Sequence, residues 1–447
     1  MKVNVIINLL FLFLTIGFDG YGQKNPASSS PTTPLENYVN RIDSSFRLQS
    51  YQKTKTADGI YYEVSLISQT WQSIPWKHRL ITYFPGTPKF PGTMLMVLRH
   101  LYNRDGDMGA LKIVSDSTGT PAGILYDIPN QPLFDGMEED DLQAYTFSQY
   151  LKTGDESWPL LFPMVKSVVR AMDMVQRLAR KEQQGAVSGF VVTGHSKRGH
   201  ASWLTAAADK RVIGIIPIAI DILNSKAQLP HHLEAFGEYS TPSVAATELL
   251  LELKQPKGDS LIKMVDAFTF REQLTLPKLI VSATNDNFFA TDALNMYWDG
   301  LIKPKWLVYL PNANHVSAYS DARINLTAFA FVRSVAGHKS LPELNWQYIR
   351  NGNSIVLKVN SDTNAIGARV WISKSKNKDF RLSSWQSQPM TVKDEVGKSN
   401  GAKARKYSIE VSVVTEGYMA IFGEVEFSQD GHTFLLSTQT NISSMKE

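Results

Sequence analysis

Short β-branched segments alternate with helical patterns from about residue 60 to residue 284. Several of the expected strands are apolar throughout, as strands covered on both faces of a parallel sheet must be. They are Tyr61–Ser68, Arg79–Phe84, Thr93–Leu98, Gly189–Thr193, Ile213–Ile220, Leu279–Ala283 and Trp306–Leu310. Strands that alternate with helices build a mostly parallel sheet with helices on its faces, so the pattern predicts an α/β fold.

Two helical regions interrupt this series of strands. Apolar residues recur at helical spacing from Met164 to Lys181, which predicts a helix with one face packed on the sheet. From Asn224 to about Arg271 the pattern is helical with polar interruptions. We expect residues of about 222–275 to form an insertion that caps the carboxyl edge of the sheet and selects the substrate.

The pattern changes after about Leu341 to short alternating strands separated by turn-rich stretches. The expected strands are Ser354–Val359, Ala368–Ser373, Tyr407–Val414 and Tyr418–Phe427. This predicts an α/β domain at residues 41–340 and a C-terminal β-sandwich-like domain at residues 341–447. If Trp371 or Trp385 is exposed, the sandwich could also bind polysaccharide by stacking on sugar rings, although tryptophans in sandwiches more often lie in the core.

Residues 1–22 have the pattern of a secretory signal peptide, with Lys2, an apolar run from Val5 to Phe18, and a small residue at Gly22. The run of about 14 apolar residues is shorter than the roughly 20 that span a bilayer, which argues against a membrane anchor. We therefore expect a cleaved, exported protein, periplasmic or extracellular, with no membrane span after cleavage. A Ser/Pro/Thr-rich linker is expected at residues 23–40.

Composition narrows the chemistry. The chain has no cysteine, which excludes disulfides, thiolate metal sites and a cysteine nucleophile. The net charge of +4 is small for 447 residues, and no dense basic stripe is interleaved with aromatic residues. We therefore expect no nucleic-acid partner.

The sharpest local motif is Gly194-His195-Ser196-Lys197-Arg198-Gly199, between an expected strand and a helix rich in small residues. A strand that turns tightly into a helix is how one class of hydrolases exposes a nucleophilic serine. The backbone N–H of Lys197, at the start of the helix, would face the oxyanion that develops on the substrate when such a serine attacks it. The usual motif has glycine where Arg198 stands, and here glycine returns one position later.

Chain order supports Ser196 as the nucleophile. The expected strand Leu279–Ala283 ends close to Asp286, and His315 follows Trp306–Leu310, so the order is serine, acid, histidine. We expect His315 to take the Ser196 proton and Asp286 to orient the imidazole. Asp221, at the end of Ile213–Ile220, is an alternative acid, and Asp292 is a third.

Two other groups of ionisable residues are assigned to the protein surface. His231 and His232 are neighbours, which point about 100° apart on a helix, and no further metal ligand has suitable spacing, so we expect no metal site. The acidic run from Glu138 to Asp141 is typical of a solvated face or a helix N-terminus.

Taken together, these residues resemble the PhoPQ-activated pathogenicity-related protein family over nearly the whole mature length. The matching segments include Trp76–His78, Ile128–Leu133, Glu139–Asp140, Ala144–Thr146, Phe162–Met164, Arg170–Asp173, Gly194–Gly199, Ala208–Val212, Leu276–Lys278, Asp286–Phe289, Pro311–His315, Asp379–Arg381 and Glu424–Phe427. The resemblance implies an α/β-hydrolase fold with a sandwich-like tail, and a triad of Ser196, Asp286 and His315.

The chain departs from the family pattern at two positions. His200 stands where tryptophan is usual, and Asn287 where an acidic residue is usual. The motif around Ser196 is also similar to that of glucuronoyl esterases, in which the basic side chain after the serine helps at the oxyanion. This similarity implies the same role for the Lys197 side chain.

The expected reaction is hydrolysis of a carboxylic ester or amide, in a small molecule or a polymer, through an acyl-enzyme on Ser196. Such chemistry requires no cofactor. The alternative is a secreted binding or signalling protein that keeps the fold without turnover, motivated by Arg198 and the appended sandwich. The substrate, the choice between ester and peptide bond, and the oligomeric state stay open at this point.

Overall fold

The computed structural model describes residues 32–239, 249, 252–253, 255–361, 365–397, 403–429 and 431–444. The predicted signal peptide at residues 1–22 lies outside the described residues. The chain divides into two units, Met1–Thr33 and Pro34–Glu447, and the second is described below. The last seven residues of the predicted linker form helix α1 (Pro34–Asn40), whose Leu35 and Val39 are buried. That part of the linker prediction is therefore wrong.

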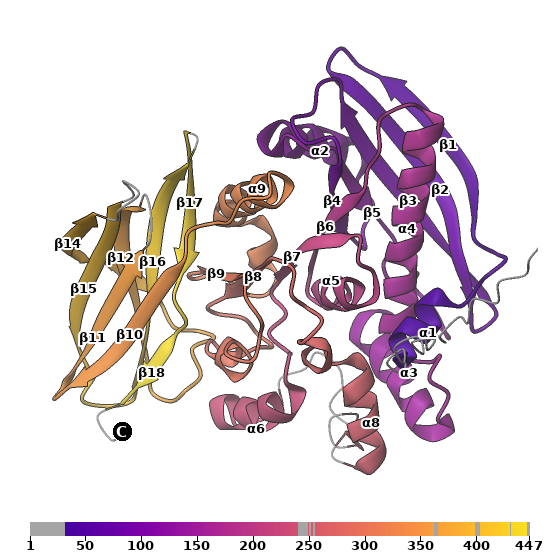
Figure 1. Cartoon of the computed structure of the whole chain (residues 1–447). Helices are drawn as coiled ribbons and strands as arrows, with labels where there is room; N and C mark the ends of the chain where they lie inside the picture. Colours follow the sequence, from indigo (N-terminus) through magenta and orange to yellow (C-terminus); the bar gives the residue numbers. More distant parts are fainter. Residues whose placement is uncertain are drawn as a thin grey trace, which may run out of the picture. The chain divides into compact units, whose positions relative to one another are not determined.

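A nine-stranded sheet organises the first part of the second unit (Figure 1). In sheet order its strands are β1 (Arg47–Lys55), β2 (Gly59–Trp71), β3 (Ile74–Pro85), β5 (Ala122–Leu125), β4 (Thr93–Leu98), β6 (Gly189–His195), β7 (Val212–Ile218), β8 (Lys278–Ala283) and β9 (Lys305–Leu310). The strands from β5 to β9 are parallel, and β1, β2 and β3 pair antiparallel. This mostly parallel sheet with the predicted helices around it is the α/β-hydrolase fold.

Helices cover both faces of this sheet. The described helices from residue 104 onward are α2 (Arg104–Thr118), α3 (Glu139–Thr153), α4 (Leu161–Lys181), α5 (Lys197–Ala208), α6 (Ser225–Phe236), α8 (Pro256–Val265) and α9 (Ala322–Ala336), with the short 3-10 helices η1 (Ala267–Phe270), η2 (Ala293–Met296) and η3 (Ser317–Ser320). Helices α4 and α5 pack on one face, and α9 packs on the other (Figure 1). Adjacent residues of β6 divide between the two cores, because Val192 packs with α4 and Val191 packs with α9. Strand β6, which ends next to Ser196, is thus buried on both sides.

The predicted helix Met164–Lys181 is present and begins three residues earlier, at Leu161. Pro163 lies in its first turn, where the missing N–H costs no hydrogen bond. The predicted insertion is helical where it is described, in α6 and α8. Most of its expected segment Ala245–Leu253 lies outside the described residues.

The C-terminal strands form two further antiparallel sheets. One has the order β10 (Leu344–Asn351), β11 (Ser354–Ser361), β15 (Lys403–Ser412) and β14 (Thr391–Gly397). The other has the order β13 (Gln386–Pro389), β12 (Ala365–Ser375), β16 (Tyr418–Gln429) and β17 (His432–Ser437), with β18 (Asn441–Ser443) paired to β16. Leu357 from the first sheet and Val425 from the second belong to one buried cluster, as in a β-sandwich.

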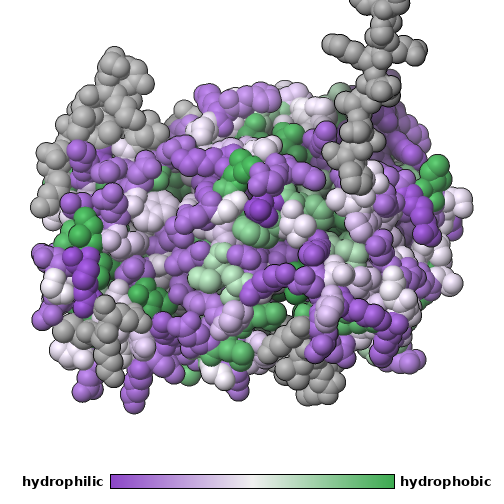
Figure 2. Space-filling view, turned by 60° about the horizontal axis from the view of Figure 1, so that its bottom comes forward, coloured by the Kyte–Doolittle hydropathy of each residue, from purple (hydrophilic) through white to green (hydrophobic). Residues whose placement is uncertain are grey.

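The two tryptophans considered for stacking on sugars are in the core of this sandwich. Trp371 is 8% exposed and Trp385 is 2% exposed. The more common core position, which the sequence favoured, is therefore confirmed, and neither ring is available for stacking. The surface in Figure 2 shows small apolar areas separated by polar ones.

The sandwich packs directly on the end of the large sheet. The backbone N–H of Tyr309 in β9 donates to Ser437 Oγ in β17 at 3.0 Å, and Thr327 Oγ1 in α9 donates to the carbonyl of Leu435 at 3.0 Å. The two parts share one compact unit. A domain boundary near residue 341 therefore stays a prediction.

Candidate active site

Ser196 occupies a tight turn between β6 and α5. Its backbone has φ 56° and ψ −129°, a region that residues other than glycine rarely adopt. The Ser196 N–H donates to the carbonyl of Ile218 in the neighbouring strand at 2.8 Å. Strained backbone of this kind persists where surrounding structure enforces it, often at functional sites.

The displaced glycine of the motif has a steric reason. A Cβ atom on Gly199 would lie 2.8 Å from the carbonyl oxygen of Gly194 and 2.8 Å from Ile220 Cγ2. A Cβ on Gly194 would lie 2.6 Å from the backbone carbon of Arg198. Close contact between β6 and α5 therefore requires glycine at positions 194 and 199. Position 198 is not subject to this requirement and carries a long side chain.

His315 and Asp286 lie in loops after β9 and β8. His315 Nδ1 donates to Asp286 Oδ2 at 2.8 Å, and both residues are buried. The other oxygen, Asp286 Oδ1, accepts the backbone N–H of Phe288 at 2.8 Å. The carboxylate is thus held from two sides, and the imidazole has its Nε2 atom left for another partner.

The other candidate acids have different partners. Asp221 Oδ1 accepts the hydroxyl of Tyr297 at 2.5 Å, and burial raises the pKa of Asp221 to about 6. Asp292 Oδ1 is 2.7 Å from His231 Nε2. Of the three acids considered, Asp286 is the one hydrogen-bonded to His315.

Ser196 and His315 line the same cavity but are not hydrogen-bonded to each other. Neighbouring His195 holds the histidine loop in place, because its Nε2 donates to the backbone carbonyl of His315 at 2.7 Å. Burial, and next the charge of His315, lower the pKa of His195 to about 4, so His195 is neutral near pH 7. It acts as a hydrogen-bond donor and carries no charge into the site.

An ionic network with buried cations and half-exposed carboxylates lies beside Ser196. The guanidinium of Arg198 binds both carboxylate oxygens of Glu139, and its Nε donates to the carbonyl of Ile128 at 2.6 Å. Lys197 Nζ donates to Glu139 Oε2 at 3.1 Å and to Asp140 Oδ1 at 2.5 Å. Burial alone would raise the pKa of Glu139, but Arg198 and Lys197 outweigh it and hold that pKa far below its usual range.

This network changes two predictions. Glu139 and Asp140 begin α3, as the charge run indicated, but they also line the site and are not simply solvated. The Lys197 ammonium is paired with these carboxylates. The expectation that the Lys197 side chain helps at the oxyanion therefore has no support here. Its backbone N–H lies in the first turn of α5, where helix donors have no intrahelical acceptor.

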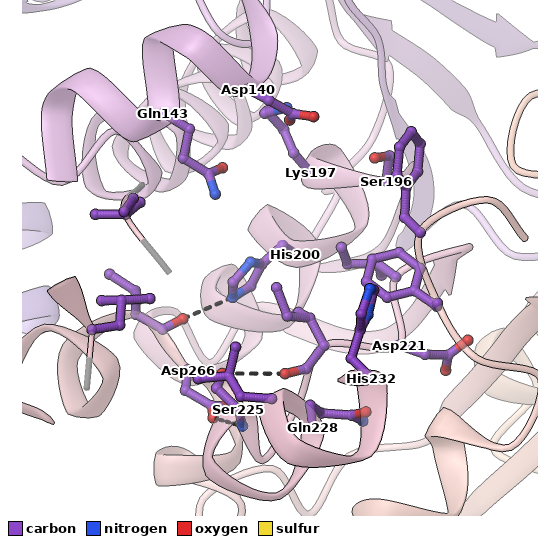
Figure 3. Close-up of a pocket in the computed structure, with 18 of the residues that line it drawn as sticks. Asp140, Gln143, Ser196, Lys197, His200, Asp221, Ser225, Gln228, His232 and Asp266 are labelled. Carbon is purple, nitrogen blue, oxygen red and sulfur yellow. Dashed lines mark hydrogen bonds and ion pairs between the residues drawn. The ribbon is translucent and has the colours of Figure 1, made fainter. Parts of the chain in front are cut away.

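The cavity has a volume of about 460 Å³. Figure 3 shows Lys197 and Asp140 near Ser196 at one end, and Ser225, Gln228 and Asp266 at the other. His231 and His232 of the cap helix α6 line the cavity as well, so their assignment to a solvated surface is wrong. No cluster of three or more potential metal ligands occurs among the described residues.

A loop of the sandwich contacts the loops that carry Asp286 and His315. The side-chain amide of Asn285, next to Asp286, donates to the carbonyls of Phe380 at 3.0 Å, Arg381 at 3.2 Å and Ser383 at 2.7 Å. These three residues lie between β12 and β13.

The histidine loop is bound to the same sandwich loop through Asn312. Asn312 Nδ2 donates to the carbonyl of Trp385 at 3.0 Å, and Asn312 Oδ1 accepts the Trp385 N–H at 2.8 Å. The acid and histidine loops are also joined directly, because the Asn285 N–H donates to the carbonyl of Ala313 at 3.0 Å. Neither asparagine was singled out from the sequence.

The chain is similar to several known proteins. Solved structures that resemble it include an acetyl xylan esterase from Paenibacillus sp. R4, 13% identical with a TM-score of 0.42, covering 63% of this chain and 86% of that chain. Acetyl xylan esterase 1 from Thermoanaerobacterium sp. JW/SL YS485 is also 13% identical, with a TM-score of 0.43, and covers 69% of this chain and 95% of that chain. Scores this low carry no argument about substrate.

Sequence similarity is more informative. The chain is 30% identical over 432 residues to Autocrine proliferation repressor protein A of Dictyostelium discoideum, which covers 89% of this chain and 86% of that protein. Within the part of the chain that the structure describes, every helix is too short or too polar to cross a membrane. The family model of the PhoPQ-activated pathogenicity-related protein matches residues 35–381, and the chain therefore belongs to that family.

Proposed function

We propose that the protein is an exported serine hydrolase that cleaves a carboxylic ester or amide through an acyl-enzyme on Ser196. The observation that carries the proposal is the buried hydrogen bond from His315 Nδ1 to Asp286 Oδ2, in the cavity that Ser196 also lines. Export rests on the pattern of residues 1–22.

In the proposed reaction, Ser196 Oγ attacks the substrate carbonyl carbon while His315 Nε2 takes the hydroxyl proton. The carbonyl oxygen becomes an oxyanion, which the backbone N–H of Lys197 stabilises at the positive end of α5. The bond to the leaving alcohol or amine breaks, and His315 returns the proton to it. Water then repeats the sequence on the acyl-serine and releases the acid.

Asp286 keeps the imidazole in the tautomer with a proton on Nδ1, so that Nε2 can accept. The serine and imidazole must approach each other for the first step. Catalytic hydrogen bonds are often long without substrate and tighten in the substrate complex. A side-chain rotation within the shared cavity is therefore part of the proposal.

A fluorophosphonate probe tests the nucleophile directly. Purified protein should be labelled on Ser196, and the Ser196→Ala variant should not be labelled. Equal labelling of both proteins would refute the proposal. His315→Ala, which keeps the hydroxyl, should label far more slowly because the base is lost.

A second candidate function is a secreted signalling protein without turnover. The observation in its favour is the similarity to a protein whose name describes an autocrine repressor of proliferation. A proliferation assay separates the candidates: Ser196→Ala should keep full activity if the fold serves only binding, and should lose it if hydrolysis carries the signal.

A further inference from the structure

We propose, building on the hydrolase function above, that the substrates are esters that carry no negative charge and whose buried arm is apolar. Two features of the cavity lead to this substrate class: the chemistry of its walls, and the pairing of its charged groups.

One wall of the cavity is apolar. Helix α8 contributes Leu261, Ile262 and Val265, which are 0%, 7% and 7% exposed, and Phe147 of α3 lies among the lining residues as well. Phe288, from the acid loop, packs edge-on against the His315 ring at 4.7 Å between ring centres. Apolar side chains thus extend from beside His315 to the cap. An apolar group of the substrate that binds along them would be removed from contact with water, which is favourable.

The charges near Ser196 neutralise one another. Lys197 and Arg198 supply two positive charges, and Glu139 and Asp140 supply two negative ones, all within one hydrogen-bonded network. A substrate carboxylate would have to displace Glu139 or Asp140 to reach either cation. The network therefore offers no free counterion to an anionic substrate.

Three other ionisable groups of the cavity also have partners. Asp266 accepts backbone N–H groups from Asn224 at 3.2 Å, Ser225 at 2.7 Å and Phe268 at 2.9 Å. Asp221 is bonded to Tyr297, and His231 to Asp292. Among the described lining residues, a substrate carboxylate would lose its hydration without gaining a counterion, which is costly.

The volume limits the length of the buried arm. An apolar cavity of about 150 Å³ holds one benzene molecule, so about 460 Å³ holds roughly 18 carbon-sized atoms. A nitrophenyl ester uses roughly half of this volume for its leaving group and ester atoms. Acyl chains of up to roughly eight carbons should therefore fit.

A panel of p-nitrophenyl esters tests the inference with the full-length protein. From acetate through butyrate and hexanoate to octanoate, kcat/KM should rise by up to about fourfold for each methylene buried. The succinate monoester replaces the terminal methyl of butyrate by a carboxylate. Its kcat/KM should be at least about 100-fold below that of butyrate.

A matched pair of variants tests the wall. Ile262→Phe fills part of the cavity and should lower the ratio of octanoate to acetate kcat/KM. Ile113→Phe makes the same change on α2, where Ile113 is 63% exposed, and should keep the wild-type ratio. Because the readout is a ratio, a loss of folded protein does not imitate the effect.

The outcomes separate this inference from the proposed function. If the probe labels Ser196 but the succinate ester is cleaved as well as butyrate, the substrate class is wrong and the nucleophile stands. Labelling without cleavage of any of these esters, or a rate independent of chain length, also overturns the inference alone. Failure of the probe to label Ser196 removes the proposed function itself.

Discussion

Replacing Asn285 by alanine should disturb catalysis through the loop that carries Asp286. The Asn285 side-chain amide donates to three carbonyls of the sandwich loop and is 8% exposed. A typical hydrogen bond contributes about 1 kcal/mol net, and a buried polar group left without a partner costs about 1–3 kcal/mol. We expect Asn285→Ala to lower the free energy of unfolding by about 2 kcal/mol.

The effect on activity should exceed the effect on substrate binding. A displacement of about 1 Å in a catalytic group can lower the rate by about 100-fold, so kcat should fall by roughly 10- to 100-fold with little change in KM. Asn360→Ala removes an exposed amide from β11 and serves as control, with a stability change within about 0.5 kcal/mol. Wild-type kcat and an unchanged denaturation midpoint in Asn285→Ala would refute the reasoning.

Three further predictions concern the turn at Ser196 and the carboxylates of Asp286 and Asp221. Gly199→Ala should destabilise the protein by about 1–3 kcal/mol, because its Cβ would meet Gly194 O and Ile220 Cγ2 at 2.8 Å, whereas Gly109→Ala has open space and should be neutral or stabilising in a denaturant titration. Asp286→Asn should lower kcat by on the order of 1,000-fold or more and Asp221→Asn by far less; the reverse order in steady-state kinetics would exchange their roles. Burial raises the pKa of Asp221 from 3.8 to about 6, so folding takes up a proton between these pH values, and the wild type should lose on the order of 3 kcal/mol as pH rises through them. The free energy of unfolding, measured from pH 3.5 to 7, should fall less in Asp221→Asn than in the wild type. Identical pH profiles would contradict the raised pKa of Asp221.

The sequence predicted those parts of the fold whose burial leaves a clear pattern. All seven expected strands of the large sheet are present, because strands buried on both faces read as apolar runs. Strand β1 was missed because it is exposed along most of its length, with the sequence Arg47–Lys55 rich in polar residues. Strand β5 is four residues long and includes Gly123, which is too little pattern to recognise.

The site was only partly predictable for a similar reason. Chain order and strand ends predicted that Ser196, Asp286 and His315 lie at one edge of the sheet, since sheet geometry gathers strand ends there. Glu139 was missed because its partner Arg198 lies 59 residues away, and a charge run gives no sign of the ion pairs that its residues form. The available signal was the pair Lys197-Arg198 directly after an apolar strand, which requires nearby counterions.

The contact between β17 and β9 affects how the chain can be divided. Strand β9 is the last strand of its sheet, and its outer side lies against the sandwich through Tyr309 and Ser437. A polypeptide that ends at residue 340 would expose the backbone N–H and C=O groups on the outer edge of β9. An exposed edge of this kind can pair with a strand of another molecule. Expression of the part before residue 341 by itself should therefore yield aggregates, and exchange of the C-terminal sandwich for an unrelated module would need a replacement strand to cover β9.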